Sequence, residues 1–550
     1  MQRWIIVVAL LVRIFISLVT TTFFQPDEYF QSLEVAHHLV FGYGHLTWEW
    51  LTQKPIRSIL YPALNVPIYW LLKQTNSDNS ILLIYGPRVL HGALAACTDI
   101  SLYKLTLRVA GPKYATVALF ISLTSFFHGF ALSRSLSNSL ETSLTTIALS
   151  YFPWGIPSSS WRNDLRKSLV FAALTCAVRP TNAVIWVYMM GLLLWRLRFD
   201  RKRLASIIMD VLFIGSCAVF LLFVLDSLYY GKPTFTPLNF LAANLSSISL
   251  FYGSSPWHYY LFQGLPIICT FSLPFVLHGA WLARKHLANP ELRDMLGLIA
   301  WTIGIYSLAG HKEWRFIHPL LPLLHILAAT SLVHSYETDQ IKRGCPKKKR
   351  NVMLPIRRSH LLLILLNVPL IFYVIRVHSR AQIEVMYYLR SLPEKEVQSI
   401  GFLMPCHSTP WQAYVHNPSL AENGKMWALG CEPPLRGENL QAYKDQTDIF
   451  YESPATYLRT RFPSNVDPSF PPSPYPCSMP GVHDTTLYPW NHTWPQYLVM
   501  FGALLDEPDV VPILVEKGYQ EVWRAEYGVG GDDTRQGGVV VWKFSPSLST

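Results

Sequence analysis

The first 378 residues alternate between long apolar runs and short polar segments. A helix that crosses a bilayer needs about 20 mostly apolar residues. Runs of this kind predict membrane spans near residues 4–23, 81–101, 113–132, 139–155, 206–226, 257–280, 294–309, 316–335 and 359–378. The pattern therefore predicts a mainly α, polytopic membrane protein.

The apolar run 168–195 is unusual because Arg179-Pro180 interrupts it and a basic segment lies at each end. Proline removes a backbone donor and disfavours helix at the preceding residue. One continuous span would place the two basic segments on opposite faces of the membrane, whereas two half-helices return the chain to the same face. We therefore predict a pair of half-helices here, and about 11 transmembrane or re-entrant segments in total.

Composition and charge agree with this prediction. Of the 550 residues, 51% are hydrophobic and 15% are charged, whereas soluble domains carry roughly 25% charged residues. The net charge of +11 would suit a nucleic-acid partner, but the basic residues cluster in short loops at 161–167, 196–203, 283–287 and 341–358. Short positive loops mark the cytoplasmic face. Their distribution argues for membrane lipids and against nucleic acid, and it places 24–80, 227–256, 310–315 and 379–550 on the opposite face.

Residues 379–550 are the only extramembrane region large enough to form a domain, separate from the membrane module 1–378. Within this region, residues 451–480 are rich in Pro and Ser and predict a long loop. The pattern at 520–544 predicts two short strands around a Gly/Asp turn. We expect an α+β domain on the non-cytoplasmic side.

The polar region also contains cysteines and an acceptor triplet for N-glycosylation. Cys406, Cys431 and Cys477 permit at most one disulfide within it; Cys406 and Cys431 are the nearer pair in sequence, which leaves the pairing open. "NHT" makes Asn491 a glycosylation candidate, and "NLS" makes Asn244 another. Both asparagines lie on the predicted non-cytoplasmic side.

The stretch "FQPDEYFQS" (24–32) places two adjacent carboxylates, Asp27 and Glu28, directly after the first apolar run. Ionisable groups at lipid are costly and are functional candidates by default. A carboxylate at the boundary between water and lipid is well placed to deprotonate a hydroxyl. Asp27 is an equally good N-cap for a helix beginning at Tyr29, a role that does not exclude catalysis.

The turn "HKEWR" (311–315) concentrates four ionisable residues, His311, Lys312, Glu313 and Arg315, between two predicted spans. Lys binds phosphate as a point charge and Arg as a planar fork. The density of mixed charge favours a site for an anionic headgroup over a merely solvated turn.

Further polar residues at the same face have two interpretations each. Arg134, Asn138 and Glu141 recur at about one-turn intervals and fit either a network between helices or the lining of a cavity. Arg179 fits either a backbone cap or a deeper phosphate ligand. Lys232 lies among aromatic residues and prolines, where it would contact a sugar or a lipid.

Taken together, these stretches resemble the lipid-linked mannosyltransferases of the GT-C fold, the group that holds the late N-glycan-precursor and the GPI-anchor enzymes. The resemblance rests on "PDE", "SRSLSNSLET" (133–142), "RPTN" (179–182), "DSLYYGKPTFTPLNF" (226–240) and "HKEWRF" (311–316), in that order. "FLMPCHSTPWQAYVH" (402–416) and "DIFYESP" (448–454) extend it to the C-terminal region and towards the GPI branch. It covers nearly the whole chain.

The resemblance implies an inverting enzyme of the endoplasmic-reticulum membrane, with its active site and C-terminal domain lumenal. Mannose would pass from dolichyl-phosphate mannose to a GPI precursor that carries two mannoses, in α-1,2 linkage. The alternatives are a sibling enzyme that acts on the N-glycan precursor or adds a fourth GPI mannose and, less favoured, a lipid transporter without chemistry. Against a transporter, only one broken segment occurs and no repeat matches it.

Within that implied reaction each candidate residue has an expected role. Asp27 is the expected base. Glu28 would orient the sugar or serve as the alternative base. His311, Lys312, Arg315 and Arg179 would stabilise the leaving phosphate, and Glu313 would position Lys312 or Arg315. Displacement with inversion needs no enzyme nucleophile. There is no DxD motif, so we predict no metal and no cofactor, and we infer no obligate protein partner.

Overall fold

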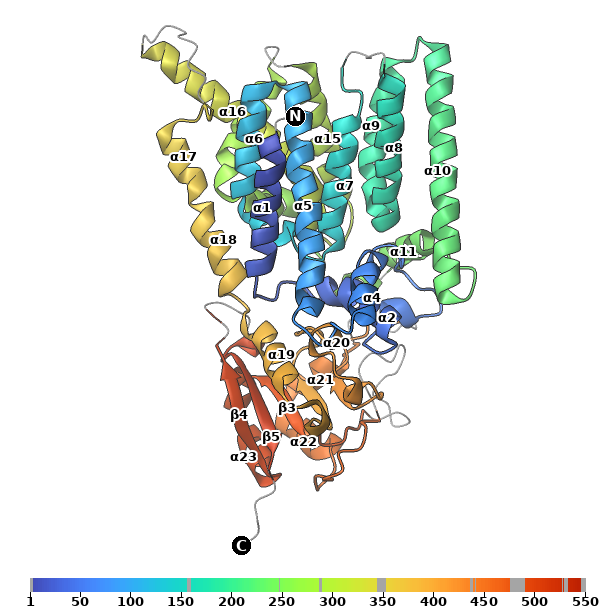
Figure 1. The fold of residues 1–550 in the computed structure, drawn as a ribbon, viewed down its shortest axis with the longest axis vertical. Coiled ribbons are helices and arrows are strands. Elements are labelled where there is room, and N and C mark those ends of the chain that lie inside the picture. The colour runs from blue at the N-terminus through green and yellow to red at the C-terminus, as the bar shows by residue number, and fades with distance from the viewer. Residues whose placement is uncertain are drawn as a thin grey trace.

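The computed structural model describes residues 3–155, 160–246, 248–285, 289–343, 353–435, 439–440, 442–474, 490–526, 528 and 533–545. It consists of a long helical module and a smaller α+β part at one end (Figure 1). The helices of the module are α1 (Arg3–Val19), α5 (Leu82–Val109), α6 (Pro112–Thr124), α7 (Ser137–Tyr151), α8 (Trp161–Val178), α9 (Ala183–Arg196), α10 (Arg201–Tyr230), α13 (Leu265–Cys269), α14 (Leu273–Arg284), α15 (Pro290–Ser307), α16 (Leu321–Lys342), α17 (Arg358–Leu365) and α18 (Asn367–Arg376).

Each predicted span overlaps one helix or a run of consecutive helical segments, although the boundaries differ. The first helix ends at Val19, four residues early, and α5 continues eight residues beyond 101. By length and apolar composition, four helical segments among the described residues suffice to cross a membrane: 201–230, 260–284, 314–342 and 358–391. The protein is thus mainly helical with membrane-spanning candidates, and the count of about 11 stays a prediction.

The predicted break at Arg179-Pro180 is confirmed. Helix α8 ends at Val178, a 3-10 turn covers Pro180–Asn182, and α9 follows. Arg162 near the start of α8 pairs with Asp210 near the start of α10, so the chain returns to the end from which it came. With 18 and 14 residues, α8 and α9 are about 27 and 21 Å long at 1.5 Å per residue. They are substantial helices and not the short half-helices expected.

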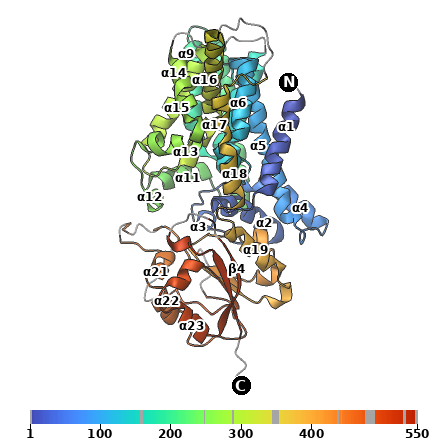
Figure 2. The same cartoon turned by 90° about the vertical axis from the view of Figure 1, so that its left-hand side faces the viewer.

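The helical module has one large apolar cluster, which includes residues of α5 to α9 and α13 to α17, and smaller clusters where α1 packs against its neighbours. Glycine permits the closest approach: a Cβ at Gly279 of α14 would lie 1.9 Å from the carbonyl oxygen of Leu327 in α16. Helices α8 and α10 begin, and α14 and α16 end, at the end of the molecule remote from the sheet (Figures 1 and 2). The described basic residues at these helix ends therefore gather at one end of the molecule, where the loop pattern predicts them.

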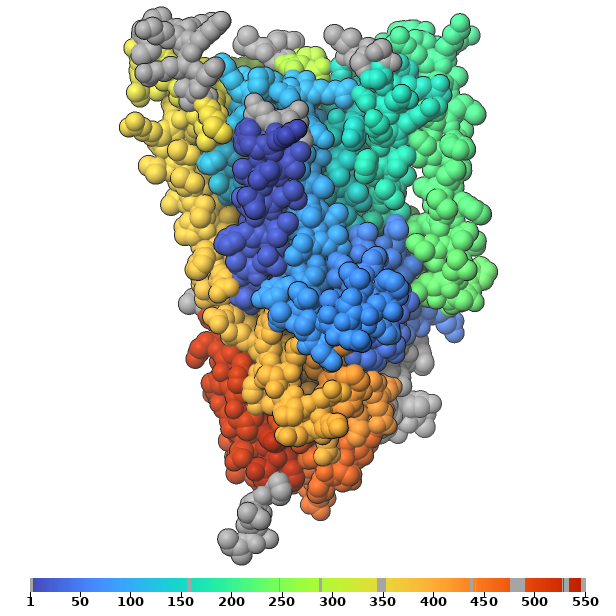
Figure 3. Space-filling model, in the orientation of Figure 1, coloured from blue at the N-terminus to red at the C-terminus, as the bar shows by residue number. Residues whose placement is uncertain are grey.

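The segments predicted on the opposite face gather near the α+β part. They include the N-terminal loop elements and the helices that follow α10: the π-helical turn Tyr29–Leu33, α2 (Glu34–Phe41), α3 (Trp48–Leu51), α4 (Val66–Gln74), α11 (Thr236–Leu245) and α12 (Ile248–Phe251). Figure 3 shows the surface of the N-terminal loop (blue) directly against that of the C-terminal part (yellow-orange).

The C-terminal part is built on a mixed five-stranded sheet in the order β2-β1-β3-β5-β4. Its strands are β1 (Ile400–Leu403), β2 (Met426–Ala428), β3 (Tyr497–Phe501), β4 (Tyr519–Ala525) and β5 (Val539–Phe544). Strand β1 runs parallel to β2 and β3, with Ile400 opposite Tyr497, while β5 runs antiparallel to β3 and β4. The antiparallel β4–β5 pair confirms the two strands predicted within 520–544.

Helices cover both faces of this sheet. Side chains alternate along a strand, so Tyr497, Val499 and Phe501 pack with α19 (Ala381–Ser391) and α20 (Gln412–Val415). Leu498 and Met500 pack on the other face with α21 (Gln446–Glu452), α22 (Pro454–Arg461) and α23 (Val510–Glu516), an arrangement visible in Figure 2. The long loop predicted for 451–480 is wrong for its first third, because α21 and α22 extend through Arg461; residues 475–480 lie outside the described residues.

Candidate active site

A cavity of about 620 Å³ lies where the helical module meets the α+β part. Each of the four segments predicted on the non-cytoplasmic side contributes to its lining: Asp27, Gln31, Glu49 and Arg57; Phe240, Asn244 and Tyr252; His311, Lys312, Glu313 and Arg315; and Cys406, His407 and Cys431. Arg179, from the break between α8 and α9, also reaches it. Tertiary folding thus brings the candidate residues of distant motifs together.

Asp27 faces this cavity. Pro26 begins a helical turn that continues into the π-helical turn Tyr29–Leu33, and this turn carries Asp27 beside Arg315. Asp27 Oδ2 accepts a hydrogen bond of 2.6 Å from Arg315 Nη1, whereas Oδ1 has no hydrogen-bond partner in the described part of the chain. No side chain caps the π-helical turn, so the N-cap interpretation of Asp27 is wrong.

Glu28 points away from the cavity and is buried. Its Oε2 lies 3.2 Å from Nη1 of Arg134, which also donates to the carbonyl oxygen of Thr22 at 2.7 Å. Burial raises the pKa of Glu28, although Arg134 and Arg88 act in the opposite direction. Of the two adjacent carboxylates only Asp27 lines the cavity, because consecutive residues of a helical turn point about 100° apart.

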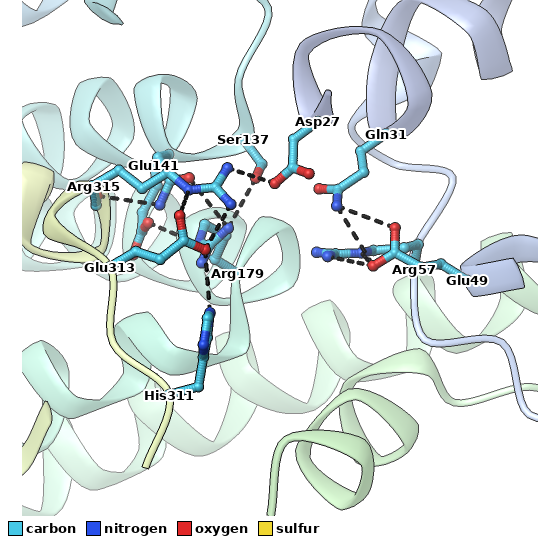
Figure 4. Close-up of polar contacts among 11 residues, drawn as sticks. Asp27, Gln31, Glu49, Arg57, Ser137, Glu141, Arg179, His311, Glu313 and Arg315 are labelled. Carbon is cyan, nitrogen blue, oxygen red and sulfur yellow. Dashed lines mark hydrogen bonds and ion pairs between the residues drawn. The ribbon is translucent and has the colours of Figure 1, made fainter. Parts of the chain in front are cut away.

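The charged turn forms a chain of ion pairs around Glu313 (Figure 4). Arg315 donates to Glu313 through Nε at 2.6 Å and through Nη2 at 2.8 Å, and His311 Nε2 lies 3.3 Å from the same carboxylate. Burial opposes ionisation, yet Arg315 and His311 hold the pKa of Glu313 well below its usual range. The hydrogen bond to Glu313 raises the pKa of His311. Glu313 therefore contacts Arg315, one of the two residues that it was expected to position, and His311, but it does not pair with Lys312.

Lys312 differs from the arginines in its partners. Its Nζ donates to the carbonyl oxygen of Ser255 at 2.7 Å and to that of Ala309, and none of the described carboxylates pairs with it. An ammonium has three donors, so one remains for a ligand at the cavity.

Arg179 and its neighbours lie deeper in the module. Arg179 Nε is 3.1 Å from Glu141 Oε2, and Nη1 donates to Ser137 Oγ at 3.0 Å. Glu141 also accepts from Asn182, while Asn138 Nδ2 contacts the carbonyl oxygen of Arg315 at 3.4 Å. Glu141 and Asn138 thus form a network between helices that holds Arg179 and Arg315 at the cavity wall.

Three other predicted residues have different surroundings. Lys232 is exposed, does not line the cavity, and donates to the carbonyl oxygen of Gln53 at 2.8 Å. Asn491 is exposed. Asn244 lies on the cavity wall, where its Nδ2 donates to the carbonyl oxygen of Phe240.

Glu49, Arg57 and Gln31 complete the cavity and were missed by sequence reasoning. Arg57 Nη2 donates to Glu49 at 2.7 Å, and Gln31 Nε2 contacts the same carboxylate at 3.1 Å. The sequence signal for Glu49 was a single charge within an aromatic stretch, "TWEW" (47–50), which does not reveal that Arg57 and Gln31 contact it.

The α+β part forms one wall of the cavity, and buried hydrogen bonds join it to the N-terminal loop. Glu34 of α2 accepts backbone hydrogen bonds from His45, Gln412 and Ala413 at 2.8 to 3.1 Å. Burial raises the pKa of Glu34 to about 7, although these three hydrogen bonds act in the opposite direction. His37 Nε2 contacts His416 Nδ1 at 2.8 Å. The open question of cysteine pairing is settled as Cys406–Cys431; Cys477 lies outside the described residues.

The described residues offer one group suited to a metal: Cys406, His407 and Cys431, whose donor atoms lie within 4.8 Å of one another. Two of these donors are joined in the disulfide, which removes them as thiolate ligands. The absence of a metal stays a prediction.

Comparison with known proteins settles the family. A sequence model of the Alg9-like mannosyltransferase family matches residues 4–416. The chain belongs to this family. It is 36% identical over 549 residues to a protein of Yarrowia lipolytica named GPI mannosyltransferase 3, with 98% of this chain and 97% of the relative covered. It is 35% identical to human GPI alpha-1,2-mannosyltransferase 3, with 84% of this chain and 77% of the relative covered.

The fold agrees with this membership. Crystal structures of ArnT from Cupriavidus metallidurans, in the apo state and bound to undecaprenyl phosphate, match with TM-scores of 0.57 and 0.56. Each alignment covers all of this chain and 98% of the ArnT chain, at 13% and 12% sequence identity respectively. The likeness shows a shared fold. The predicted glycosyltransferase of the GT-C type is confirmed by family and fold together.

Proposed function

We propose that this family member transfers mannose from dolichyl-phosphate mannose to a GPI precursor that carries two mannoses, adding the third in α-1,2 linkage. The support is the identity of 35 to 37% to relatives named for GPI α-1,2-mannosyl transfer, maintained over most of the chain. The alternative acceptors, the N-glycan precursor and the three-mannose GPI, are outcomes of the test below.

The observation that carries the mechanism is Asp27 at the cavity wall, with one oxygen held by Arg315 and the other free to accept a proton. The donor is β-linked and the product α-linked, so one displacement with inversion suffices. An acceptor hydroxyl attacks the anomeric carbon, Asp27 Oδ1 takes its proton, and the bond from that carbon to the phosphate oxygen breaks. Dolichyl phosphate leaves.

The leaving phosphate is stabilised mainly by Lys312, and further by Arg315, His311 and Arg179. Lys312 bonds only to backbone carbonyls within the described chain, so its charge is available to an anion. Arg315 and Arg179 keep donors beyond those used on Glu313, Asp27 and Glu141. Donors fixed in place before the reaction stabilise developing charge without reorganisation.

The proposed location is the endoplasmic-reticulum membrane, and the proposed orientation places the cavity and the α+β part on the lumenal side. Basic helix ends gather at the opposite end of the molecule, and such clusters face the cytoplasm. The Cys406–Cys431 disulfide fits an oxidising compartment.

The test uses the purified full chain in detergent with dolichyl-phosphate mannose and synthetic GPI acceptors bearing one, two or three mannoses, beside the dolichol-linked N-glycan precursor. We expect transfer only to the two-mannose acceptor, giving a product sensitive to α-1,2-mannosidase. Transfer to another acceptor would refute the third-mannose assignment, and no transfer to any of them would refute the proposed reaction.

A further inference from the structure

One wall of the cavity is formed by the α+β part, and none of its residues has a role in the proposed mannosyl transfer. Cys406, His407 and Cys431 line the cavity that also contains Asp27. His407 belongs to the loop between β1 and α20. His407 and Asp27 line the same cavity, and the charge of Asp27 acts to raise the pKa of His407.

This loop is held in an unfavourable backbone conformation. His407 has φ of 56°, the left-handed region that side chains with a Cβ rarely adopt and that tends to persist at functional sites. Cys406, the residue before His407, is held by its disulfide to Cys431, which lies 25 residues further along the chain. Gln382 Nε2 binds the carbonyl oxygen of the following Ser408. The loop is therefore held on both sides of His407.

The His407 ring has a defined orientation. It packs on Phe30 with ring centroids 4.5 Å apart, and Phe30 lies three residues after Asp27. Nδ1 is 3.7 Å from Cys431 Sγ. The structure gives Nε2 no hydrogen bond to the described parts of the chain, and His407 lines the cavity. With Nδ1–H donating to sulfur, Nε2 is the acceptor of the neutral ring.

The chemistry of this wall differs from that of the charged turn. Burial lowers the pKa of His407 to about 4, although Asp27 acts in the opposite direction, so the ring is neutral near pH 7. A neutral acceptor beside an aromatic face suits an uncharged sugar hydroxyl better than a phosphate. Lys312, Arg315 and Arg179, which are proposed to hold the phosphate, belong to the helical module, although the α+β part also adds Arg535 to the lining.

We propose that His407, positioned by the Cys406–Cys431 disulfide, forms a subsite that hydrogen-bonds a hydroxyl of the acceptor glycan. This proposal rests on the proposed function and deepens it. The lipid-linked donor binds at the Lys312 wall, and the acceptor glycan lies between Asp27 and His407.

The test measures KM for acceptor and donor separately in His407→Gly, His407→Ala and His407→Asn. Glycine removes the ring and also relieves the strained φ, so loss of affinity in this variant does not come from added backbone strain. We expect Gly and Ala to raise the acceptor KM about five- to ten-fold, the value of one neutral hydrogen bond, and the donor KM less than about two-fold. Asparagine tolerates the left-handed conformation and should recover most of the lost affinity.

His38→Ala is the matched control, since this half-buried histidine of α2 lies off the cavity. An unchanged acceptor KM in both Gly and Ala would overturn the proposal, and so would equal rises in both KM values. If the wild-type chain transfers no mannose to the two-mannose acceptor, the proposed function fails first, and the two failures are thereby distinguished.

The disulfide has its own readout. Dithiothreitol should raise the acceptor KM of the wild-type protein towards that of Cys406→Ser/Cys431→Ser and should not raise it further in the double variant. An acceptor KM that ignores both the reductant and the double substitution would show that the disulfide does not position His407.

Discussion

Two ion pairs of the same chemistry have opposite surroundings in this protein. Asp27 and Arg315 meet at 2.6 Å at the cavity, where their side chains are 22% and 10% exposed. Arg13 of α1 and Asp99 of α5 also meet at 2.6 Å, but both are fully buried within the helical module. Ser122 completes the second pair by donating to Asp99 at 2.6 Å and accepting, through its carbonyl oxygen, from Arg13.

The comparison shows what charge within an apolar segment means. Both aspartates interrupt or border hydrophobic runs, and both would be functional candidates on that ground. The sealed pair joins α1, α5 and α6 and has no access to substrate, whereas the open pair leaves Asp27 Oδ1 available. Access to the cavity, and not charge, separates a site from a scaffold.

The largest expected effect comes from the open pair. Asp27→Asn removes the proposed base and should lower kcat by about 10²–10⁴-fold, the usual contribution of a positioned general base. The melting temperature should change little, because the side chain is partly exposed. Single-turnover transfer and thermal unfolding in detergent measure the two quantities.

Glu28→Gln is the neighbouring control for that variant. It weakens the buried pair with Arg134 and should lower the melting temperature, while kcat per folded molecule falls less than about ten-fold. A larger kcat loss in Glu28→Gln than in Asp27→Asn would assign the base to Glu28 and contradict the geometry.

The sealed pair should give the inverse result. Asp99→Asn leaves Arg13 buried without its counter-charge, which costs about 3–5 kcal/mol of stability. Molecules that remain folded should keep a kcat close to the wild-type value. Unfolding in detergent and kcat per monodisperse protein test this, with Lys113→Met as the control, since the exposed Lys113–Glu337 pair is worth under about 1 kcal/mol. A lost kcat at unchanged stability would give Arg13–Asp99 a functional role.

The smallest effect concerns pH and the contact between the two parts. The pKa of Glu34 is about 7 in the folded protein against an ordinary 4.5. Because the folded protein holds this proton more tightly than the unfolded chain does, Glu34 contributes fully to stability below about pH 4.5. This contribution to stability is lost as the pH rises through about 7. The melting temperature should therefore fall more between about pH 5 and pH 8 in wild type than in Glu34→Gln. Equal slopes would show that Glu34 does not titrate in this window.

The sequence by itself determined the helical segments, the break at Arg179-Pro180, the β4–β5 pair and the family. These features are local or nearly so: apolar runs of membrane length, a proline that removes a donor, alternation around a turn, and motifs in a fixed order. It also predicted that Asp27, Arg315, Lys312 and His311 lie on one face of the membrane, because short basic loops indicate the opposite face.

Only the tertiary structure decided how those residues meet. It directed Asp27 into the cavity and Glu28 onto Arg134, a difference that two adjacent carboxylates do not reveal in sequence. It placed Lys232 outside the cavity, brought Glu49 and Arg57 into it, and added His407 from the α+β part. Glu28 and Arg134 are 106 residues apart and Asp27 and Arg315 are 288 apart, so these contacts are set by the whole fold and not by local pattern.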